Sequence, residues 1–264
     1  MFKGQEEKKS VDLWLPDGAR FIVVSDCQVP FEDAALLQSI FGVFAPWYKR
    51  GASRFDLFLT GDVMDNYSLS RFPPRVTPLF TLEQEVEATK AYLTSWRKKF
   101  DNVYFAFGNH EDRWDREIYN NAPALAFATD TLAEVLTLDT LGIEHVPYLR
   151  HFNANGFVFT HGDIVRENTA AAMLANYSSS GTSGHVNRPH SFTKADARDG
   201  EPNTWYCTGM TCRMDIGDYI KDWRRIQPWQ QGFGIGEVHN GRVHFQLVRV
   251  HGGSYWASGK MFNV

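Results

Sequence analysis

The chain has 264 residues, 43% of them hydrophobic and 14% aromatic, which is enough apolar material for a full core and excludes a disordered or disulfide-stapled peptide. Its 27 Lys and Arg residues nearly balance 31 Asp and Glu residues. The net charge of −4 disfavours broad, non-specific binding to duplex nucleic acid but does not exclude a local basic groove. Three cysteines without a repeating spacing predict neither a disulfide framework nor a cysteine-based zinc site.

The sequence contains no apolar run that approaches the roughly 18 residues of a membrane span. Residues 1–12 are rich in Lys, Glu and Gln and lack the apolar stretch of a signal peptide, so we expect them to be flexible. We also expect a cytoplasmic protein that does not bind membranes. Because the chain has no internal repeat and no long Pro- or Ser-rich linker, residues 1–264 are expected to form a single domain.

Predicted strands and helices alternate in the first part of the chain. Continuous apolar runs, typical of strands buried on both faces, occur at residues 19–25, 55–60 and 102–107. Apolar residues at helical spacing predict a helix over 33–50 and another over 81–100, where Thr81 and Gln84 can form a capping box. This alternation predicts parallel strands joined by crossover helices, with ligands beyond the carboxyl ends of the strands.

The middle of the chain is less regular. Residues 111–141 are expected to be mostly helical with a break at Pro123, followed by strands at 145–149 and 156–160. Residues 176–201 are rich in Ser, Gly, Asn, Asp and Arg and are predicted to be long loops. Loops of this length inside a domain are often functional.

The last part of the chain is predicted to be mainly strands. Apolar runs indicate strands at residues 204–210, 232–238 and 242–250. The last two are joined through Asn240 and Gly241, a dipeptide that strongly favours a hairpin turn. We therefore expect an antiparallel edge or a second sheet packed against the strand-and-helix half.

Polar residues with oxygen or nitrogen donors follow the apolar runs or stand beside a glycine. They are Asp26, Gln28, Asp62, Asp65, Asn109, His110, His161, His185 and Asn187. This mixture of donors suits hard or borderline divalent metals. Two such ions about 3.5–4 Å apart can share a bridging carboxylate and a bridging hydroxide, lower the pKa of water and clamp an in-line displacement at phosphorus.

Five short motifs occur in a fixed order. They are Asp-x-Gln at residue 26, Gly-Asp-x-x-Asp at 61, Gly-Asn-His-Glu at 108, His-Gly-Asp at 161 and Gly-His-x-Asn at 184. This order resembles the calcineurin-like metallophosphoesterase superfamily. The resemblance implies an α/β protein with a four-layer α/β/β/α sandwich and mixed sheets. It also implies metal-dependent hydrolysis of a phosphomonoester or phosphodiester by a bridging hydroxide in a two-metal site.

The resemblance also implies which side chains bind the metals. Asp62 would bridge the two ions, one site would be completed by Asn109, His161 and His185, and the other would be formed by Asp26, Gln28 and Asn187. Gln28 and Asn187 stand where the commonest family pattern has His, so two amide oxygens replace two imidazoles. We therefore expect two divalent ions, Mn²⁺ first and Mg²⁺, Fe²⁺ or Zn²⁺ as alternatives, with looser occupancy of the second site.

The remaining residues of the motifs are expected to handle the phosphoryl group. His110 resembles the family's non-ligand histidine, which stabilises the charged phosphoryl group or protonates the leaving oxygen. Asp65 would hydrogen-bond His110 and fix its orientation. Arg113 and Arg188 are candidate phosphate contacts, with exposed salt bridging as the default alternative for each.

The sequence favours a metallophosphoesterase whose partner is a phosphoester substrate, either a small molecule or a nucleic-acid end. One alternative is a DNA or RNA nuclease of the same superfamily. Another, of a different class, is a catalytically weak or inactive protein-binding scaffold, because two ligand histidines are replaced. Retention of His110 and Asp65 speaks against the scaffold, which needs neither.

Overall fold

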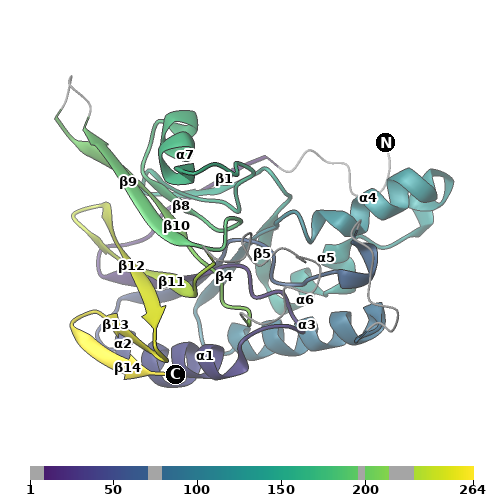
Figure 1. Ribbon diagram of the computed structural model, residues 1–264, viewed down its shortest axis with the longest axis horizontal. Helices are drawn as coiled ribbons and strands as arrows, with labels where there is room; N and C mark the ends of the chain where they lie inside the picture. The colour runs from purple at the N-terminus through teal and green to yellow at the C-terminus, as the bar shows by residue number, and fades with distance from the viewer. Residues whose placement is uncertain (1–8, 71–78, 196–199, 214–228) are drawn as a thin grey trace.

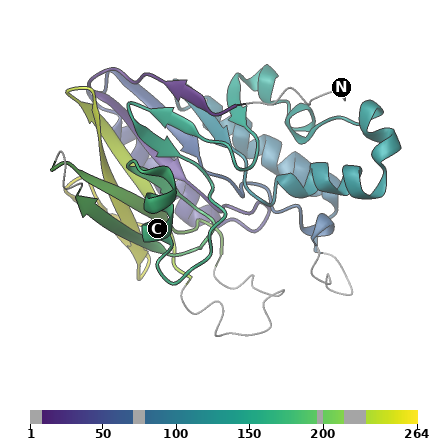
Figure 2. The same cartoon turned by 90° about the horizontal axis from the view of Figure 1, so that it is seen from above.

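Two mixed β-sheets lie face to face between helices in the computed structural model (Figures 1 and 2). The structure describes residues 9–70, 79–195, 200–213 and 229–264. Val11 and Asp12, at the end of the segment expected to be flexible, belong to strand β1 (Val11–Leu13). Residues 1–8 lie outside the described part of the chain.

The larger sheet has eight strands and carries the predicted parallel core. Across the sheet they are β14 (Lys260–Asn263), β13 (Ser254–Ala257), β12 (Arg242–His251), β11 (Gly232–His239), β2 (Ala19–Val24), β3 (Arg54–Leu59), β4 (Asn102–Ala106) and β5 (Ile143–Val146). Strands β2 to β5 are parallel, whereas β11 to β14 pair antiparallel at one side. Asn240 and Gly241 both have positive φ in the β11–β12 turn, as the hairpin prediction requires.

The smaller sheet has six strands. Their order is β1, β6 (Phe152–Ala154), β7 (Phe157–Phe159), β8 (Gly181–Ser183), β10 (Pro202–Thr208) and β9 (Pro189–Ala195). It is also mixed, since β7, β8 and β10 run parallel and β9 pairs antiparallel with β10. The carboxyl ends of β7 and β8 therefore point the same way.

Three hydrophobic clusters separate four layers. The first cluster packs helices against the larger sheet, and these helices are α1 (Ala34–Gln38), the π-helix η1 (Ser39–Phe44), α2 (Ala45–Tyr48) and α3 (Leu82–Arg97). The second lies between the two sheets, where the Phe58 and Phe159 rings stack 3.9 Å apart. The third packs α7 (Thr169–Tyr177) on the outside of the smaller sheet, against Trp205. The α/β/β/α sandwich expected from the sequence is the fold that the structure has.

The remaining helical elements lie between β3 and β5 in the chain. They are η2 (Tyr67–Leu69), α4 (Asp112–Asn121), η3 (Pro123–Ala128), α5 (Leu132–Val135) and α6 (Leu138–Leu141). The predicted break is present, because α4 ends at Asn121 and Pro123 begins η3. The capping box of Thr81 and Gln84 is present at the start of α3.

Two sequence predictions about this region and the next were wrong. Residues 176–201 are not simply long loops, because they contain the end of α7, strand β8 and strand β9. Strand β8 is only three residues of Gly, Thr and Ser, which carry no hydrophobic pattern. The strand expected at 145–149 is β5, which ends at Val146 because Pro147 has no N–H for the ladder.

Candidate metal centre

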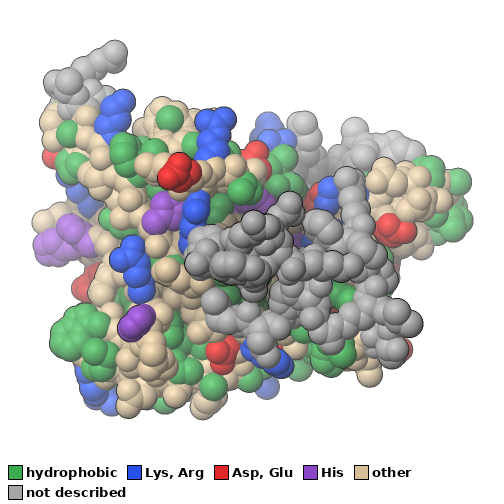
Figure 3. All heavy atoms as spheres, in the orientation of Figure 1, with side chains coloured by type: hydrophobic (Ala, Val, Ile, Leu, Met, Phe, Trp, Pro, Cys, Tyr) green, Lys and Arg blue, Asp and Glu red, His purple; other side chains and the backbone are tan. Residues whose placement is uncertain are grey.

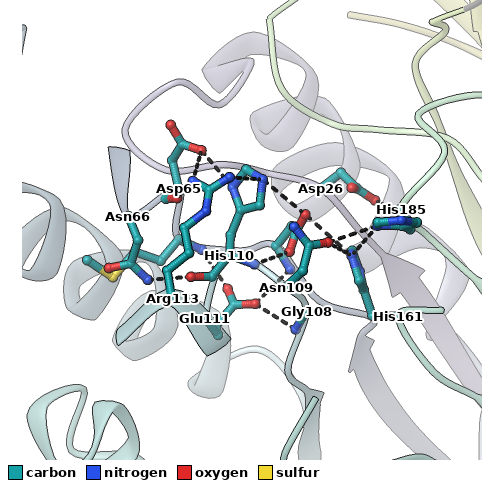
Figure 4. Close-up of polar contacts among 12 residues, drawn as sticks. Asp26, Asp65, Asn66, Gly108, Asn109, His110, Glu111, Arg113, His161 and His185 are labelled. Carbon is teal, nitrogen blue, oxygen red and sulfur yellow. Dashed lines mark hydrogen bonds and ion pairs between the residues drawn. The ribbon is translucent and has the colours of Figure 1, made fainter. Parts of the chain in front are cut away.

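The predicted metal-binding residues come from five loops that meet at one edge of the sandwich. Asp26, Asp62 and Asn109 follow β2, β3 and β4 of the larger sheet, while His161 and His185 follow β7 and β8 of the smaller one. Since the parallel strands end on the same side, their loops converge although the residues lie far apart in sequence. Figure 4 shows the Asn109, His161 and His185 side chains pointing toward one another.

The side chains of Asp62, Asn109, His161 and His185 bring their ligand atoms together. We call three of them, Asn109, His161 and His185, the imidazole half of the metal centre. Asn109 Oδ1 lies 3.0 Å from His161 Nε2 and 2.8 Å from His185 Nδ1. His161 Nε2 also lies 3.3 Å from Asp62 Oδ2. Asp62, His161 and His185 can each offer one ligand atom within 4.8 Å of the others. Such a cluster of nitrogen and oxygen atoms fits a divalent cation.

Protonation of the two histidines is set by their surroundings. His161 Nδ1 lies 2.8 Å from Thr60 O and donates to it, which turns Nε2 toward the cluster. Burial lowers the pKa of His161, but the Asp62 carboxylate outweighs burial and raises this pKa to about 10. Burial, with the nearby His161 charge, lowers the pKa of His185 to about 4 and keeps it neutral. The cluster thus favours one positive charge at His161 Nε2, and either a proton or a bound cation can supply it.

Asp26, Gln28 and Asn187 form a second group, which we call the amide half, and all three are buried. Asp26 Oδ2 accepts a hydrogen bond from the His185 N–H at 3.0 Å, which joins this group to the imidazole half. Gln28 N–H donates to Asp62 O at 2.9 Å, so the loops after β2 and β3 run side by side. Asp26 Oδ1 and Asn187 Oδ1 are buried without a hydrogen-bond partner among the described residues. Buried oxygens without donors are the atoms that an oxygen-ligated cation would satisfy.

The backbone at the predicted ligands is unusual. Positive φ values between 51° and 70° occur at Asp26, Gln28, Asp62, His185 and Asn187. The left-handed region is uncommon for residues other than glycine and costs on the order of 1 kcal/mol or more per residue. Such backbone conformations cluster at functional sites, where the surrounding structure holds them in place.

His110 stands beside the imidazole half and is held by three side chains. Its Nδ1 lies 2.7 Å from Asp65 Oδ1, and its Nε2 lies 3.5 Å from Asp62 Oδ2. Arg113 Nη2 lies 2.9 Å from His110 Nε2, and His110 Nδ1 carries a proton toward Asp65. Burial lowers the pKa of His110, but the charges of Asp62 and Asp65 outweigh it and the net pKa is raised.

Glu111, the last residue of the Gly-Asn-His-Glu motif, has a function that the sequence did not reveal. Its buried carboxylate accepts hydrogen bonds from the backbone N–H groups of Asp62 at 2.9 Å, Met64 at 3.0 Å and Gly108 at 2.7 Å. Glu111 therefore clamps the loop after β3 to the loop after β4. The only sequence signal was its place in the motif, because backbone donors cannot be assigned from residue types.

Close approach explains the glycine at position 108. A Cβ on Gly108 would collide with the carboxylate of Asp62. The loop can reach Asp62 only without a side chain there, so this glycine lets the shared carboxylate lie against the backbone.

The two candidate phosphate contacts lie in different surroundings. Arg113 is 14% exposed and, besides His110, donates from Nη1 to Asp65 O at 2.8 Å. Arg188 instead donates to the carbonyl oxygens of Arg166 and Glu167. The structure therefore places Arg113 at the metal centre. The hydrogen bonds of Arg188 instead hold the loop at residues 166–167 in place.

The backbone behind Asp26 is held from a distant part of the chain. Asp26 O accepts hydrogen bonds from the N–H groups of Thr211 at 3.2 Å and Cys212 at 3.1 Å. The Thr211 hydroxyl also donates to Ser25 O at 3.0 Å. The segment after β10 thus supports the first ligand loop.

A sequence model of the calcineurin-like phosphoesterase family matches residues 19–203, which is more than half of the chain. The chain belongs to this family of phosphoesterases. Its members typically bind divalent metals, in agreement with the ligand cluster of the imidazole half.

Two phage proteins are similar to nearly the whole chain. The Gene 54 proteins of Mycobacterium phage D29 and Mycobacterium phage L5 are each 25% identical to it, over 93% of this chain and 99% of their own length. Their names state no activity. Among the described residues, the structure has no helix with the length and apolar character needed to cross a membrane.

Proposed function

We propose that this protein hydrolyses a phosphomonoester or phosphodiester with two divalent cations bound at the loops after β2, β3, β4, β7 and β8. The observation that supports this most directly is the convergence of Asp62, Asn109, His161 and His185 on one point beside the His110–Asp65 pair. A structural role would not require imidazole, amide and carboxylate atoms to face one another in a buried cluster.

Asp62 is the residue that would serve both cations, because it lies between the imidazole half and the amide half. Its Oδ2 faces His161, while its backbone carbonyl contacts the Gln28 N–H. Burial raises the pKa of Asp62, but the charges of His110 and His161 outweigh it and keep this pKa below its ordinary value. When bound, the two cations would supply Lewis-acid activation of water and of the phosphoryl oxygens.

We assign the proton transfer to His110. Asp65 holds the imidazole through Nδ1 and leaves Nε2 on the side of the metal centre. A protonated Nε2 would face the phosphoryl group or leaving oxygen of a substrate bound at Asp62. Arg113, which contacts the same nitrogen, is placed to donate to a phosphate oxygen.

Mn²⁺ is the cation that the donor set favours. The amide half offers a carboxylate and two amide oxygens, which suit a harder ion than Zn²⁺. On the face shown in Figure 3, the described Lys and Arg side chains are interspersed with acidic, histidine and apolar side chains. This distribution favours a small substrate or a nucleic-acid end over a long duplex.

Turnover of p-nitrophenyl phosphate and bis-p-nitrophenyl phosphate with Mn²⁺, Mg²⁺, Zn²⁺ or chelator tests the proposal. We expect activity with Mn²⁺ and none with chelator. His110→Ala should lower kcat by about 10²- to 10⁴-fold while metal binding, measured by calorimetry, changes little. His239→Ala, at an exposed histidine in the β11–β12 hairpin, is the matched control and should behave as wild type.

Folded protein with no turnover under any metal would refute the enzymatic proposal and favour the scaffold. Normal kcat in His110→Ala would refute the assignment of the proton donor. Cleavage of single-stranded DNA with Mn²⁺ at a rate far above that of both small esters would identify the protein as a nuclease.

A further inference from the structure

A cavity of about 210 Å³ adjoins the imidazole half of the metal centre. Its wall includes Ser70, Asn109, Arg113, Arg116 and Glu117. Asn109 belongs both to this wall and to the ligand cluster, so the cavity lies beside the metal centre. The lining carries two guanidinium groups, Arg113 and Arg116, and one carboxylate, Glu117.

Arg113 forms the side of the cavity that is nearest the catalytic histidine. Its guanidinium donates to Asp65 O and lies 2.9 Å from His110 Nε2, and Figure 4 shows it extended beside the imidazole. The bond to Asp65 O and the contact with His110 leave the Nε N–H and one N–H of each terminal nitrogen without a hydrogen-bond partner among the described residues. A guanidinium held in this way loses little side-chain entropy when it binds an anion.

Arg116 stands one turn further along α4 and is 43% exposed. Its Nε pairs with Asp112 Oδ2 at 2.8 Å, an i,i+4 contact that orients the planar group along the helix. Nη2 reaches toward Asn109 O at 3.5 Å, on the side of the cavity. The two arginines therefore present N–H groups to one small space from adjacent turns of the same helix.

We propose that this cavity binds a second phosphate group of the substrate, next to the phosphoester that is hydrolysed. The inference rests on the proposed function and narrows its substrate to phosphoesters that carry a further phosphate. Two forks of guanidinium N–H donors match the oxygens of a phosphate. A wall made mainly of arginine, amide, hydroxyl and carboxylate groups does not suit an apolar leaving group.

Matched substrates that differ by one phosphate test this subsite. The monoester pair is adenosine 5′-phosphate and adenosine 3′,5′-bisphosphate, and the diester pair is thymidine 5′-(p-nitrophenyl phosphate) with and without a 3′-phosphate. For the pair that the enzyme turns over, kcat/KM should be at least about tenfold higher with the added phosphate, mainly through KM. Arg116→Gln should bring this ratio close to one, and Arg116→Lys should restore part of it.

Arg242→Gln is the control, because Arg242 is an exposed arginine that pairs with Glu201 far along the chain in β12. It should keep the ratio of the wild type. Equal kcat/KM for both members in the wild type would overturn the subsite, and so would an Arg116→Gln variant that loses both activities equally.

Absence of all turnover would refute the proposed hydrolysis but not the binding of a phosphate group in the cavity. The subsite is then decided by calorimetry of the Mn²⁺-loaded protein. Tighter binding of adenosine 3′,5′-bisphosphate than of adenosine 5′-phosphate, lost in Arg116→Gln, would support the subsite. Equal binding of both nucleotides would overturn it.

Discussion

The two halves of the metal centre differ in how completely the protein prepares them. In the imidazole half, Asn109 Oδ1 lies within 3.0 Å of both histidine nitrogens, so the ligand atoms already meet. In the amide half, Asp26 Oδ1 and Asn187 Oδ1 are buried with no hydrogen-bond partner among the described residues. A preorganised site binds its cation more tightly than one whose neutral ligands are amide oxygens. The comparison teaches that the two cations should bind with unequal affinity.

The largest effect should come from removing a ligand of the imidazole half, and the matched comparison is removal of a ligand of the amide half. His161→Ala should cost on the order of 10³-fold in kcat, because a cation supplies several kcal/mol of transition-state stabilisation. Asn187→Gly should weaken only the looser cation by roughly tenfold and be rescued by excess Mn²⁺. Glycine is chosen there because Asn187 has φ 54°, which alanine would strain.

Calorimetric titration with Mn²⁺, together with kcat at saturating metal, checks both variants. The wild type should show two classes of site, and His161→Ala should lose the tighter one. Identical behaviour of the two variants would show that the two halves bind their cations with equal affinity, which contradicts the expected difference.

Glu111→Gln should have an intermediate effect that reaches both halves. The variant replaces one carboxylate oxygen by an amide NH₂ group, which then faces one or two of the three backbone N–H donors that the carboxylate now satisfies. We expect about 10- to 100-fold weaker binding of both cations. Calorimetry with Mn²⁺ measures this, and urea denaturation monitors stability. A loss of stability with unchanged affinity for both cations would show that Glu111 supports the fold without positioning ligands.

The smallest effect should come from Glu85, a buried carboxylate that belongs to neither half. It accepts hydrogen bonds from Tyr67 N–H at 2.9 Å and the Ser68 hydroxyl at 3.2 Å, and it fixes η2 beside Asp65. Burial raises the pKa of Glu85 to about 7. The folded state therefore holds this proton more tightly than the unfolded chain, whose Glu titrates near 4.5.

Stability should consequently fall as the pH rises from about 4.5 to about 7, by at most on the order of 3 kcal/mol from this group. Glu85→Gln should remove that part of the slope, so its stability relative to the wild type should rise between pH 5 and pH 8. Urea denaturation at the two pH values, without added metal, measures the difference. Parallel pH profiles for the two proteins would contradict a protonated Glu85.

The parallel core and the ligand loops could be predicted because the two signals are adjacent in sequence. Long apolar runs mark β2, β3 and β4, and a polar motif follows each of them directly. Parallel pairing then brings the loops to one edge without any knowledge of side-chain contacts. Of the residues named as ligands, the structure brings Asp62, Asn109, His161 and His185 together and joins Asp26 to them through the His185 N–H. The roles of all the named residues as ligands stay predictions.

The parts that could not be predicted depend on contacts between distant residues. Strand β8 has three small residues and forms because β7 and β10 flank it. The hydrogen bonds of Arg188 to the 166–167 loop, and those of Glu111 to the backbone, are made to main-chain atoms that every residue possesses. Local patterns carry no information about such partners.

The contacts behind Asp26 bear on what could be removed from this protein. The family match ends at residue 203, whereas the N–H groups that hold Asp26 O belong to Thr211 and Cys212. Strand β11, further along still, pairs with β2 and covers its second edge. A truncated gene product that stops at the end of the shared family segment would keep every proposed ligand yet lose the support of the first one. The segment that the family model matches is therefore smaller than the unit that holds the proposed ligands in place.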